Sequence, residues 1–321
     1  MIDSLRRSIS IVVPVYNEIG NIDEFVRRVI PVLETSDLLE FEIIFSVDPS
    51  TDGTIERIIE LSKLNTRIKM IVFSRRVGQP TATLAGLDYA TGDAAIVMDV
   101  DLQDPPELIP EMISKWREGF EVVYAQRRHR DGETWIKKFV ARVGYNLIDR
   151  FGEVRIPRNT GDFRLLDRRV IRELQRFPEV HGFLRGLVAL VGFRQTSVLF
   201  DRPSRYSGNG NYNRFIGSVR IGLNGLVAFS SSLLNFSTLI GFFAAITSFV
   251  VAIAYATMKV IGIEFPIGNP TIVVLILLLG GCQLVCLGIL GQYVGRIYEE
   301  VKRRPKYIID RTVGLDIHGQ N

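Results

Sequence analysis

Two aspartates stand one residue apart in the stretch Asp99–Pro106, DVDLQDPP, directly after the apolar run Ala94–Met98. Like charges this close repel each other, so the arrangement is costly unless a cation or a hydrogen-bonding ligand is bound there. Carboxylate oxygens suit Mg²⁺ or Mn²⁺, and Mg²⁺ bound in this way bridges to the phosphates of a substrate. On Asp99 and Asp101 alone, an ordinary turn at a strand end explains the pattern equally well.

A second acidic cluster, DPSTDG at residues 48–53, follows the predicted strand Glu42–Val47. Asp52 is well placed to cap a helix that begins at Thr54, which is a purely structural role. Asp48 stands at the strand end itself. It is therefore the better candidate to reach a nucleotide base or ribose.

Short β-branched runs alternate with amphipathic stretches from Ile9 to about Phe200. This alternation predicts an α/β fold with a mostly parallel sheet covered on both faces. In such sheets ligands bind beyond the carboxyl ends of the strands, and the clusters YNE, DPSTDG, SRR and DVDLQD each fall at such an end. They are therefore expected to form one active site. The predicted strands are Ile9–Val15, Glu42–Val47, Ile68–Phe73, Ala94–Asp99 and Val122–Ala125, and the predicted helices are Ile22–Leu33, Thr54–Leu64, Pro80–Ala90 and Pro106–Trp116.

The second half of the chain has a different composition. No Asp, Glu, Lys or Arg occurs between Ile221 and Met258 or between Phe265 and Gly295, and the mean hydropathy of the whole chain is +0.18. Each uncharged stretch exceeds the roughly 20 residues that a membrane-spanning helix needs. Helices of a soluble core are the alternative, but they seldom lack charge for so long. We therefore expect a hairpin of two transmembrane helices, residues 233–258 and 271–294.

Basic residues flank this hairpin on one side. Arg202, Arg205, Arg214 and Arg220 precede the first span, and Arg296, Lys302, Arg303, Arg304 and Lys306 follow the second. By the positive-inside rule, both termini and the α/β domain lie in the cytoplasm, which predicts a multi-pass protein of the inner membrane. Residues 206–232 are expected to lie along the membrane surface as an amphipathic segment, and 295–321 to form a basic cytoplasmic tail.

Five motifs occur in a fixed order: VPVYNE at residues 13–18, DPSTDGT at 48–54, SRRVGQ at 74–79, MDVDLQDPPELIPEM from 98, and NTGDFRLLDRRV at 159–170. With the two spans, this set resembles glycosyltransferase family 2. Within it, the chain is similar to the polyprenyl-phosphate glycosyltransferases, the group that contains dolichyl-phosphate mannose synthases and bactoprenol glucosyltransferases. The resemblance implies that residues 1–205 form a cytoplasmic GT-A domain that binds a nucleotide sugar.

The resemblance also implies roles for individual residues. The residues expected to bind the nucleotide sugar are Pro14, Tyr16, Asn17, Glu18, Asp48, Gln79 and Asp99. Asp101 and Gln103 are expected to hold Mg²⁺ or Mn²⁺ against the diphosphate, and Asp101 and Asp162 are the expected catalytic residues. The residues expected to bind the acceptor phosphate are Arg127, Arg130, Lys137, Lys138 and Arg205. For Lys137 and Lys138, the solvated face of an amphipathic helix is an equally good interpretation.

Asp162 is the residue that the resemblance offers as a general base. A lipid monophosphate, however, has a second pKa near ~6, so the attacking oxygen is already largely anionic at neutral pH. A strong base is therefore unnecessary. We expect Asp162 instead to orient a cation such as Arg164, or the acceptor itself.

The expected reaction is transfer of one hexose with inversion. The preferred donor is UDP-glucose, the acceptor is undecaprenyl or another polyprenyl phosphate, and the product is a β-linked lipid-phosphate sugar that serves cell-envelope polysaccharide synthesis. Transfer of mannose from GDP-mannose, or of an aminosugar, to the same lipid is the alternative. A homotetramer is compatible with the family resemblance.

Other functions fit the sequence less well. A processive polysaccharide synthase would carry a Gln-x-x-Arg-Trp motif, a nicotinamide dehydrogenase would carry G-x-G-x-x-G after the first strand, and neither motif is present. The α/β half has no basic stripe interleaved with aromatic residues, which argues against nucleic-acid binding. A non-catalytic membrane scaffold stays open, because Pro49, Gln79 and Asn211 depart from the motifs common in the family.

Overall fold

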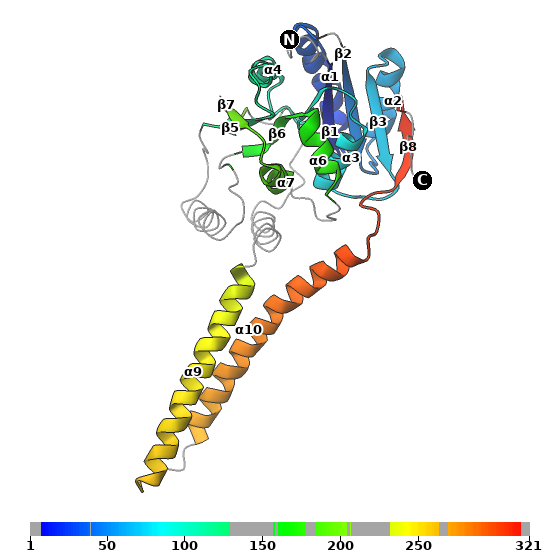
Figure 1. The fold of residues 1–321 in the computed structure, drawn as a ribbon. Coiled ribbons are helices and arrows are strands. Elements are labelled where there is room, and N and C mark those ends of the chain that lie inside the picture. Colours follow the sequence, from blue (N-terminus) through cyan, green and yellow to red (C-terminus); the bar gives the residue numbers. More distant parts are fainter. Residues whose placement is uncertain are drawn as a thin grey trace. The chain divides into compact units, whose positions relative to one another are not determined.

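The computed structural model of the chain describes residues 8–38, 40–128, 157, 160–177, 184–203, 206, 232–262 and 269–315. The chain divides into two compact units. The α/β unit comprises Met1–Tyr145, Val154–Arg214 and Arg303–Asn321, and the helical unit comprises Asn146–Glu153 and Phe215–Lys302 (Figure 1). The C-terminal segment therefore belongs to the α/β unit, although it follows the helical unit in the sequence.

The described part of the α/β unit contains one eight-stranded sheet. Its strands are β1 (Ser8–Val15), β2 (Glu40–Val47), β3 (Ile68–Phe73), β4 (Ala94–Val97), β5 (Val122–Arg127), β6 (Thr160–Asp167), β7 (Gln195–Phe200) and β8 (Ile309–Val313), in the spatial order β7-β5-β6-β4-β1-β2-β3-β8. The central strands β4, β1, β2 and β3 are parallel. β6 and β8 pair antiparallel with their neighbours, whereas β7 runs parallel to β5. The parallel centre brings the carboxyl ends of four strands to one edge.

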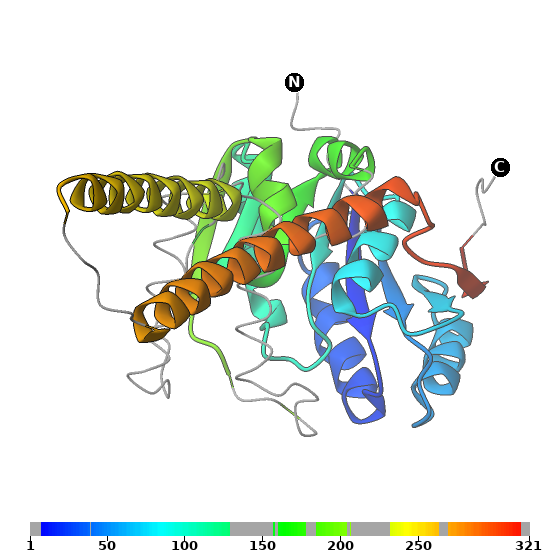
Figure 2. The ribbon, with the colours of Figure 1, turned by 90° about the horizontal axis from the view of Figure 1, so that it is seen from below.

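Helices cover both faces of the sheet (Figure 2). They are α1 (Ile19–Glu34), α2 (Thr54–Leu64), α3 (Gln79–Tyr89), the 3₁₀ turn η1 (Pro106–Leu108), α4 (Ile109–Arg117), α6 (Arg168–Gln175) and α7 (Leu184–Val191). Ile22, Phe25 and Val29 of α1 recur at helical spacing, and the same buried cluster contains Val13 of β1 and Trp116 of α4. The predicted alternation of strands and helices is confirmed.

Most predicted elements differ from the observed ones by one to three residues at an end, and two of these differences have a local cause. β4 ends at Val97 rather than at Asp99, because the chain turns there and the Asp99 N–H donates to Asp104 Oδ2 (3.3 Å). The predicted helix over residues 106–116 is a 3₁₀ turn followed by α4, whose second residue is Pro110. Both differences arise from turn geometry that periodicity does not report.

Helix α3 packs on the face of the sheet opposite α1, and Gly86 is where it approaches most closely. A Cβ atom at Gly86 would lie 2.4 Å from Val12 Cγ1 and 2.6 Å from Ser46 Oγ. Both neighbours are fully buried on β1 and β2. Only glycine fits between them, so this contact sets the spacing between α3 and the sheet.

We predict that Gly86→Ala destabilises the α/β unit by about 1–3 kcal/mol, because the methyl group must push α3 away from the sheet. Thermal unfolding of the full chain in detergent measures the effect. Gly241→Ala is the matched control, since Gly241 is also helical and nothing lies within 4 Å of its added Cβ. Equal unfolding midpoints for the two variants would contradict the prediction.

A buried glutamate joins three strands at the edge opposite the strand exits. Glu42 accepts hydrogen bonds from Ser10 Oγ (2.5 Å), Lys69 Nζ (2.7 Å), Thr91 N (2.7 Å) and Thr91 Oγ1 (2.8 Å). Burial alone would raise the pKa of this carboxyl, but these donors outweigh burial and hold the pKa of Glu42 below its ordinary value. The carboxylate is therefore ionised at neutral pH and stabilises the folded state.

The stabilisation by Glu42 is expected to depend on pH. Because the folded pKa is depressed, the contribution is present above the unfolded pKa of about 4.3 and is lost as pH falls through the folded value. Glu42→Gln should cost about 1–3 kcal/mol at pH 7 and progressively less below pH 4. Thermal unfolding of both proteins across this range tests it, and a gap that stays constant with pH would refute it.

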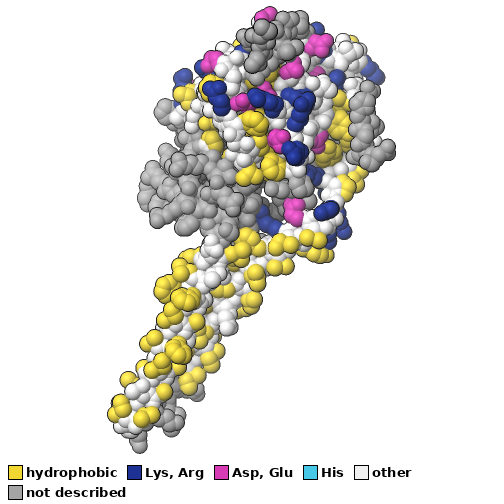
Figure 3. Space-filling model, viewed as in Figure 1, with side chains coloured by type: hydrophobic (Ala, Val, Ile, Leu, Met, Phe, Trp, Pro, Cys, Tyr) yellow, Lys and Arg dark blue, Asp and Glu magenta, His cyan; other side chains and the backbone are white. Residues whose placement is uncertain are grey.

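The described part of the helical unit consists of α9 (Ser232–Val260) and α10 (Asn269–Val301). Their most apolar segments, Leu234–Met258 and Leu275–Val301, have mean hydropathies of 2.2 and 2.0 and are long enough to cross a bilayer. Hydrophobic side chains cover their surfaces in Figure 3. Both predicted spans begin within these helices. Of the predicted interfacial segment, only Tyr206 and Ser232 lie within the described residues.

Candidate active site

The loops that follow β1 and β2 are joined by hydrogen bonds through Asn17. Its N–H donates to Ser50 Oγ (3.1 Å), and its Oδ1 accepts from Thr51 N (2.9 Å). Asn17 has a positive φ of 52°, a conformation that asparagine tolerates better than most residues. The next amide, Glu18 N, donates to Thr54 Oγ1 (3.0 Å). The YNE and DPSTDG clusters therefore form one rigid wall, as their shared sheet edge predicts.

Asp48 joins this wall to the loop after β3. Its side chain is buried, and its carboxylate accepts hydrogen bonds from Val77 N (2.8 Å) and Gly78 N (3.0 Å). Gly78 has a φ of +83°, which favours glycine. The sequence predicts that Asp48 binds the nucleotide, which stays a prediction, and the structure shows a structural role for its carboxylate. Asp48 fixes the backbone of the SRRVGQ loop.

Two further contacts join the loops after β1, β2, β3 and β4 into one connected group, here called the ring of loops. The Arg76 guanidinium lies over the Tyr16 ring, 4.0 Å from its centroid. Gln79 Nε2 donates to Asp99 Oδ1 (2.8 Å), which joins the β3 loop to the DVDLQD turn. Sequence reasoning did not select Arg76, although its SRR cluster was correctly placed at a strand end. The stack is a cation–π contact, and it presents a flat cationic surface beside the expected nucleotide site.

Three carboxylates gather at the end of β4. Asp101 and Asp104 are buried and Asp99 is half-buried; besides the Asp99–Asp104 contact, Gln103 N donates to Asp101 Oδ1 (3.1 Å). Burial, then repulsion from Asp104 and Asp101, raises the pKa of Asp99 well above its ordinary value. Burial likewise raises the pKa of Asp104 to about 6. The cluster therefore holds more negative charge than its surroundings balance, as the sequence suggested.

A divalent cation would relieve this repulsion. Among the described residues, no three His, Cys, Asp or Glu side chains converge into a complete metal site. Mg²⁺ needs no such site, because it commonly takes one or two carboxylates and completes its coordination with water and substrate phosphates. Asp99 and Asp101 fit this pattern, since desolvation and mutual repulsion favour a bound cation. Gln103 stands beside them in the turn.

A cationic cluster surrounds Asp162 on β6. Arg185 Nε of α7 donates to Asp162 Oδ1 (2.8 Å), and Arg185 Nη1 donates to the Thr160 carbonyl oxygen (3.1 Å). Burial raises the pKa of Asp162, but the charge and hydrogen bond of Arg185, with Arg164 and Arg127, outweigh it and lower the pKa overall. Asp162 is therefore a carboxylate that stays ionised, and a poor proton acceptor.

Arg164 was the expected partner of Asp162, and the structure identifies Arg185 as the hydrogen-bonding partner. Arg164 is 4% exposed and donates through Nη2 to the Gly161 carbonyl oxygen (2.7 Å). Its buried Nε has no hydrogen-bond acceptor among the described residues. Burial lowers the pKa of Arg164 to about 10, so it stays cationic at neutral pH. Nothing in the sequence near Asp162 indicates Arg185, because 23 positions separate the two residues.

The acidic cluster at the end of β4 and the cationic cluster around Asp162 lie close together. The charge of Arg127 lowers the pKa of both Asp104 and Asp162, and the charge of Arg202 lowers that of Asp99 and Asp104. Tyr206 N donates to the Asp101 carbonyl oxygen (3.3 Å), so the segment after β7 reaches the acidic turn. Of the residues expected to bind the acceptor phosphate, Arg127 is thus at the site. Arg130, Lys137, Lys138 and Arg205 lie outside the described residues.

The sequence model of glycosyl transferase family 2 matches residues 10–175, more than half of the chain. The chain is 44% identical over 313 residues to the uncharacterized glycosyltransferase sll0501 of Synechocystis, covering 96% of each chain. The chain belongs to glycosyltransferase family 2. It is also 39% identical over 305 residues to the bactoprenol glucosyl transferase of Shigella phage SfII, covering 95% of this chain and 98% of the relative.

Solved structures of low identity share the fold of this family 2 chain. Glucosyl-3-phosphoglycerate synthase from Mycobacterium tuberculosis, in complex with Mn²⁺, UDP and phosphoglyceric acid, aligns with a TM-score of 0.51. The two are 19% identical, and the alignment covers 71% of this chain and 80% of the other. The likeness confirms a GT-A-like α/β domain. The predicted family, fold and glycosyltransferase activity are therefore all confirmed.

In this family 2 chain, the Arg185–Asp162 pair is expected to stabilise the α/β unit through its mutual contact. Removing either partner takes the counter-charge from a partly buried group, so Arg185→Leu and Asp162→Leu should each cost more than half of what the double variant costs. We predict a coupling of about 1–3 kcal/mol in a double-mutant cycle followed by thermal unfolding. Arg172→Leu, on the exposed side of α6, is the control and should show no coupling to Asp162. If the stability losses of Arg185→Leu and Asp162→Leu simply add in the double variant, the predicted interaction between the two side chains is refuted.

Proposed function

We propose that this chain transfers a single glucose from UDP-glucose to polyprenyl phosphate, with undecaprenyl phosphate as the preferred lipid. The observation that carries the proposal is the proximity of an acidic and a cationic cluster at one edge of the sheet. Asp99, Asp101 and Asp104 suit a cation with a diphosphate, while Arg164 and Arg185 suit a phosphate anion. The relatives named bactoprenol glucosyl transferase support glucose and a lipid carrier.

On the donor side, the wall formed by Tyr16, Asn17 and Asp48 would bind the nucleoside, with Pro14 and Glu18 flanking it. Gln79 and Asp99 would reach the ribose and diphosphate. Asp101, assisted by Gln103, would hold Mg²⁺ or Mn²⁺. When bound, the ion supplies Lewis-acid stabilisation of the negative charge on the departing diphosphate.

On the acceptor side, Arg127, Arg164 and Arg185 would orient the lipid phosphate towards the sugar. Its oxygen forms a bond to the anomeric carbon, while the bond from that carbon to the nucleoside diphosphate breaks and the diphosphate leaves with the electron pair. This single displacement inverts the anomeric centre and gives a β-linked product. The attacking oxygen is already largely anionic, so Asp162 need not take a proton. It holds the guanidinium groups in place.

The helical unit would anchor the enzyme in the inner membrane as a two-span hairpin. Basic residues flank the spans, including Arg202 before α9, Arg296 near the end of α10 and Lys302 directly after α10. This distribution supports a cytoplasmic location for the α/β unit and both termini. The membrane location would also bring the active site to an acceptor that is itself a lipid. A homotetramer is compatible with this arrangement.

The decisive test is transfer assayed with purified full-length protein in detergent. Labelled UDP-glucose, other UDP-sugars and GDP-mannose are each incubated with undecaprenyl phosphate and Mg²⁺ or Mn²⁺, and label is counted in the organic phase. We expect transfer from UDP-glucose, loss of transfer when a chelator removes the metal, and recovery when metal is added back. Label from GDP-mannose or an aminosugar donor instead would replace glucose in the proposal.

We predict that Asp101→Asn lowers the transfer rate at least roughly 100-fold, because the carboxylate that holds the cation is lost. The matched control is Asp23→Asn, an equal change at an exposed residue of α1 that pairs with Arg57. A folded Asp101 variant that retains full activity would exclude the assigned role. No transfer from any donor by a wild-type protein that binds nucleotide would favour the scaffold alternative.

A further inference from the structure

Strand β8 follows the second apolar helix in the sequence and forms one edge of the sheet. It pairs antiparallel with β3, with Met70 opposite Val313 and Phe73 opposite Ile309. The pairing continues beyond the strand, because Ser74 N donates to the Ile308 carbonyl oxygen (2.9 Å). The C-terminal segment is thus hydrogen-bonded to the first residue of the loop at positions 74–78, here called the donor loop.

The donor loop carries three of the contacts that build the nucleotide side of the site. Arg76 stacks on Tyr16, and Val77 N and Gly78 N donate to Asp48. The next residue, Gln79, is the first of α3 and donates to Asp99. The donor loop therefore runs from the end of β3 to the start of α3. Its shape depends on how these two elements are held.

Tyr307 contacts both elements. Its ring packs edge-to-face on Phe73, the last residue of β3, with centroids 5.7 Å apart and planes at 63°. Its hydroxyl donates to Asp88 Oδ2 near the end of α3 (2.8 Å). Burial and the Asp88 carboxylate raise the pKa of Tyr307, so the phenol keeps its proton and remains a donor at neutral pH. One side chain thus connects the end of β3, where the donor loop begins, to the C-terminal end of α3, the helix that follows the donor loop.

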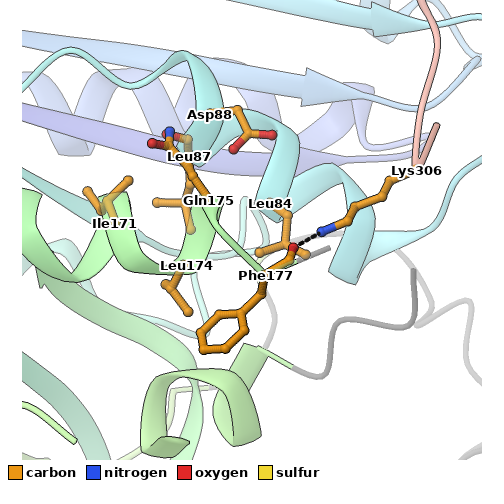
Figure 4. A pocket seen from close by; sticks show the side chains of 8 residues that line it. All are labelled: Leu84, Leu87, Asp88, Ile171, Leu174, Gln175, Phe177 and Lys306. Carbon is orange, nitrogen blue, oxygen red and sulfur yellow. Dashed lines mark hydrogen bonds between the residues drawn. The ribbon is translucent and has the colours of Figure 1, made fainter. Parts of the chain in front are cut away.

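The neighbouring residue strengthens this attachment. Lys306 Nζ donates to the carbonyl oxygen of Phe177 (2.7 Å), and Phe177 lies just after α6. Figure 4 shows Lys306 reaching Phe177 across a cavity of about 210 Å³ that Leu84 and Asp88 of α3 also line. The C-terminal segment therefore binds to β3, α3 and the end of α6 at once. None of these contacts lies in the catalytic clusters.

We propose that Tyr307, with strand β8, is a positioning residue for the nucleotide-sugar site and acts through the donor loop. It fixes the distance and angle between Phe73 and α3, which keeps the Val77 and Gly78 amides on Asp48 and Arg76 on Tyr16. This inference rests on the proposed function, because it assigns the ring of loops to the donor. It predicts that weakening the C-terminal segment impairs donor binding rather than the chemical step.

The test compares Tyr307→Phe and Tyr307→Ala with wild type in the full-length protein. Phe removes only the hydroxyl, whereas Ala also removes the ring from Phe73. We expect amide hydrogen exchange at residues 74–78 to accelerate, most strongly in the Ala variant. The dissociation constant of UDP with Mg²⁺ and the KM for the donor should rise roughly three- to tenfold, while kcat at saturating donor stays within about twofold.

Matched variants separate positioning from general damage. Tyr298→Phe removes a hydroxyl from α10 and should leave exchange and KM unchanged. Asp88→Asn keeps an oxygen that can accept from Tyr307 and should resemble wild type, whereas Asp88→Ala should resemble Tyr307→Phe. A fall in kcat without a change in KM, or unchanged exchange in the donor loop of Tyr307→Ala, would overturn the proposal.

The outcomes also distinguish this inference from the proposed function. A wild-type protein that binds no nucleoside diphosphate refutes the assigned donor site, and with it the role of Tyr307 in donor binding. If the Tyr307→Ala variant binds UDP as tightly as wild type does, the inference alone is refuted. Hydrogen exchange reports the loop contact in either case, because it needs no substrate.

Discussion

Burial and mutual repulsion of the carboxylates at the end of β4 are the constraint on which the rest of the site depends. Asp99, Asp101 and Asp104 are concentrated within one turn, and burial and proximity raise the pKa of Asp99 well above its ordinary value. A fold tolerates this arrangement only if the surrounding framework is rigid and counter-charges lie close by. Arg127 and Arg202 supply charge without neutralising the cluster. The remaining imbalance is what makes the site receptive to a cation.

The framework that holds the cluster follows from parallel strand register. Pro14 pairs with Ser46 and Val15 with Val47, so the first two loops leave the sheet side by side. Hydrogen bonds then join loop to loop, with Asp48 at the centre. The Asp48 carboxylate and the Asn17 side-chain oxygen each accept from backbone N–H groups of a neighbouring loop, which pairs these donors. The same edge therefore provides both the rigidity and the polar atoms of the site.

The sequence was sufficient for features that depend on local pattern. Thr54–Leu64 and Ile68–Phe73 have the predicted limits, because apolar periodicity and flanking turn residues determine them. It was insufficient for contacts that depend on long-range packing. Asp162 meets Arg185 only because the fold brings α7 to β6, and β8 pairs with β3 although two apolar helices lie between them in the sequence. A short, charged edge strand gives little periodic signal. The sequence therefore predicts a basic tail where the structure has β8.

The two halves of the site differ in the sign of their pKa shifts, and that difference bears on mechanism. Carboxyl pKa values are raised at the end of β4 and lowered at Asp162, although burial opposes ionisation in both places. The first half has too little positive charge to offset its carboxylates, whereas the second holds several guanidinium groups around one carboxylate. Under the proposed reaction, a metal-bound diphosphate corrects the first imbalance and an anionic phosphate the second. The charges thus favour both substrates being bound together, and they leave Asp162 no need to act as a base.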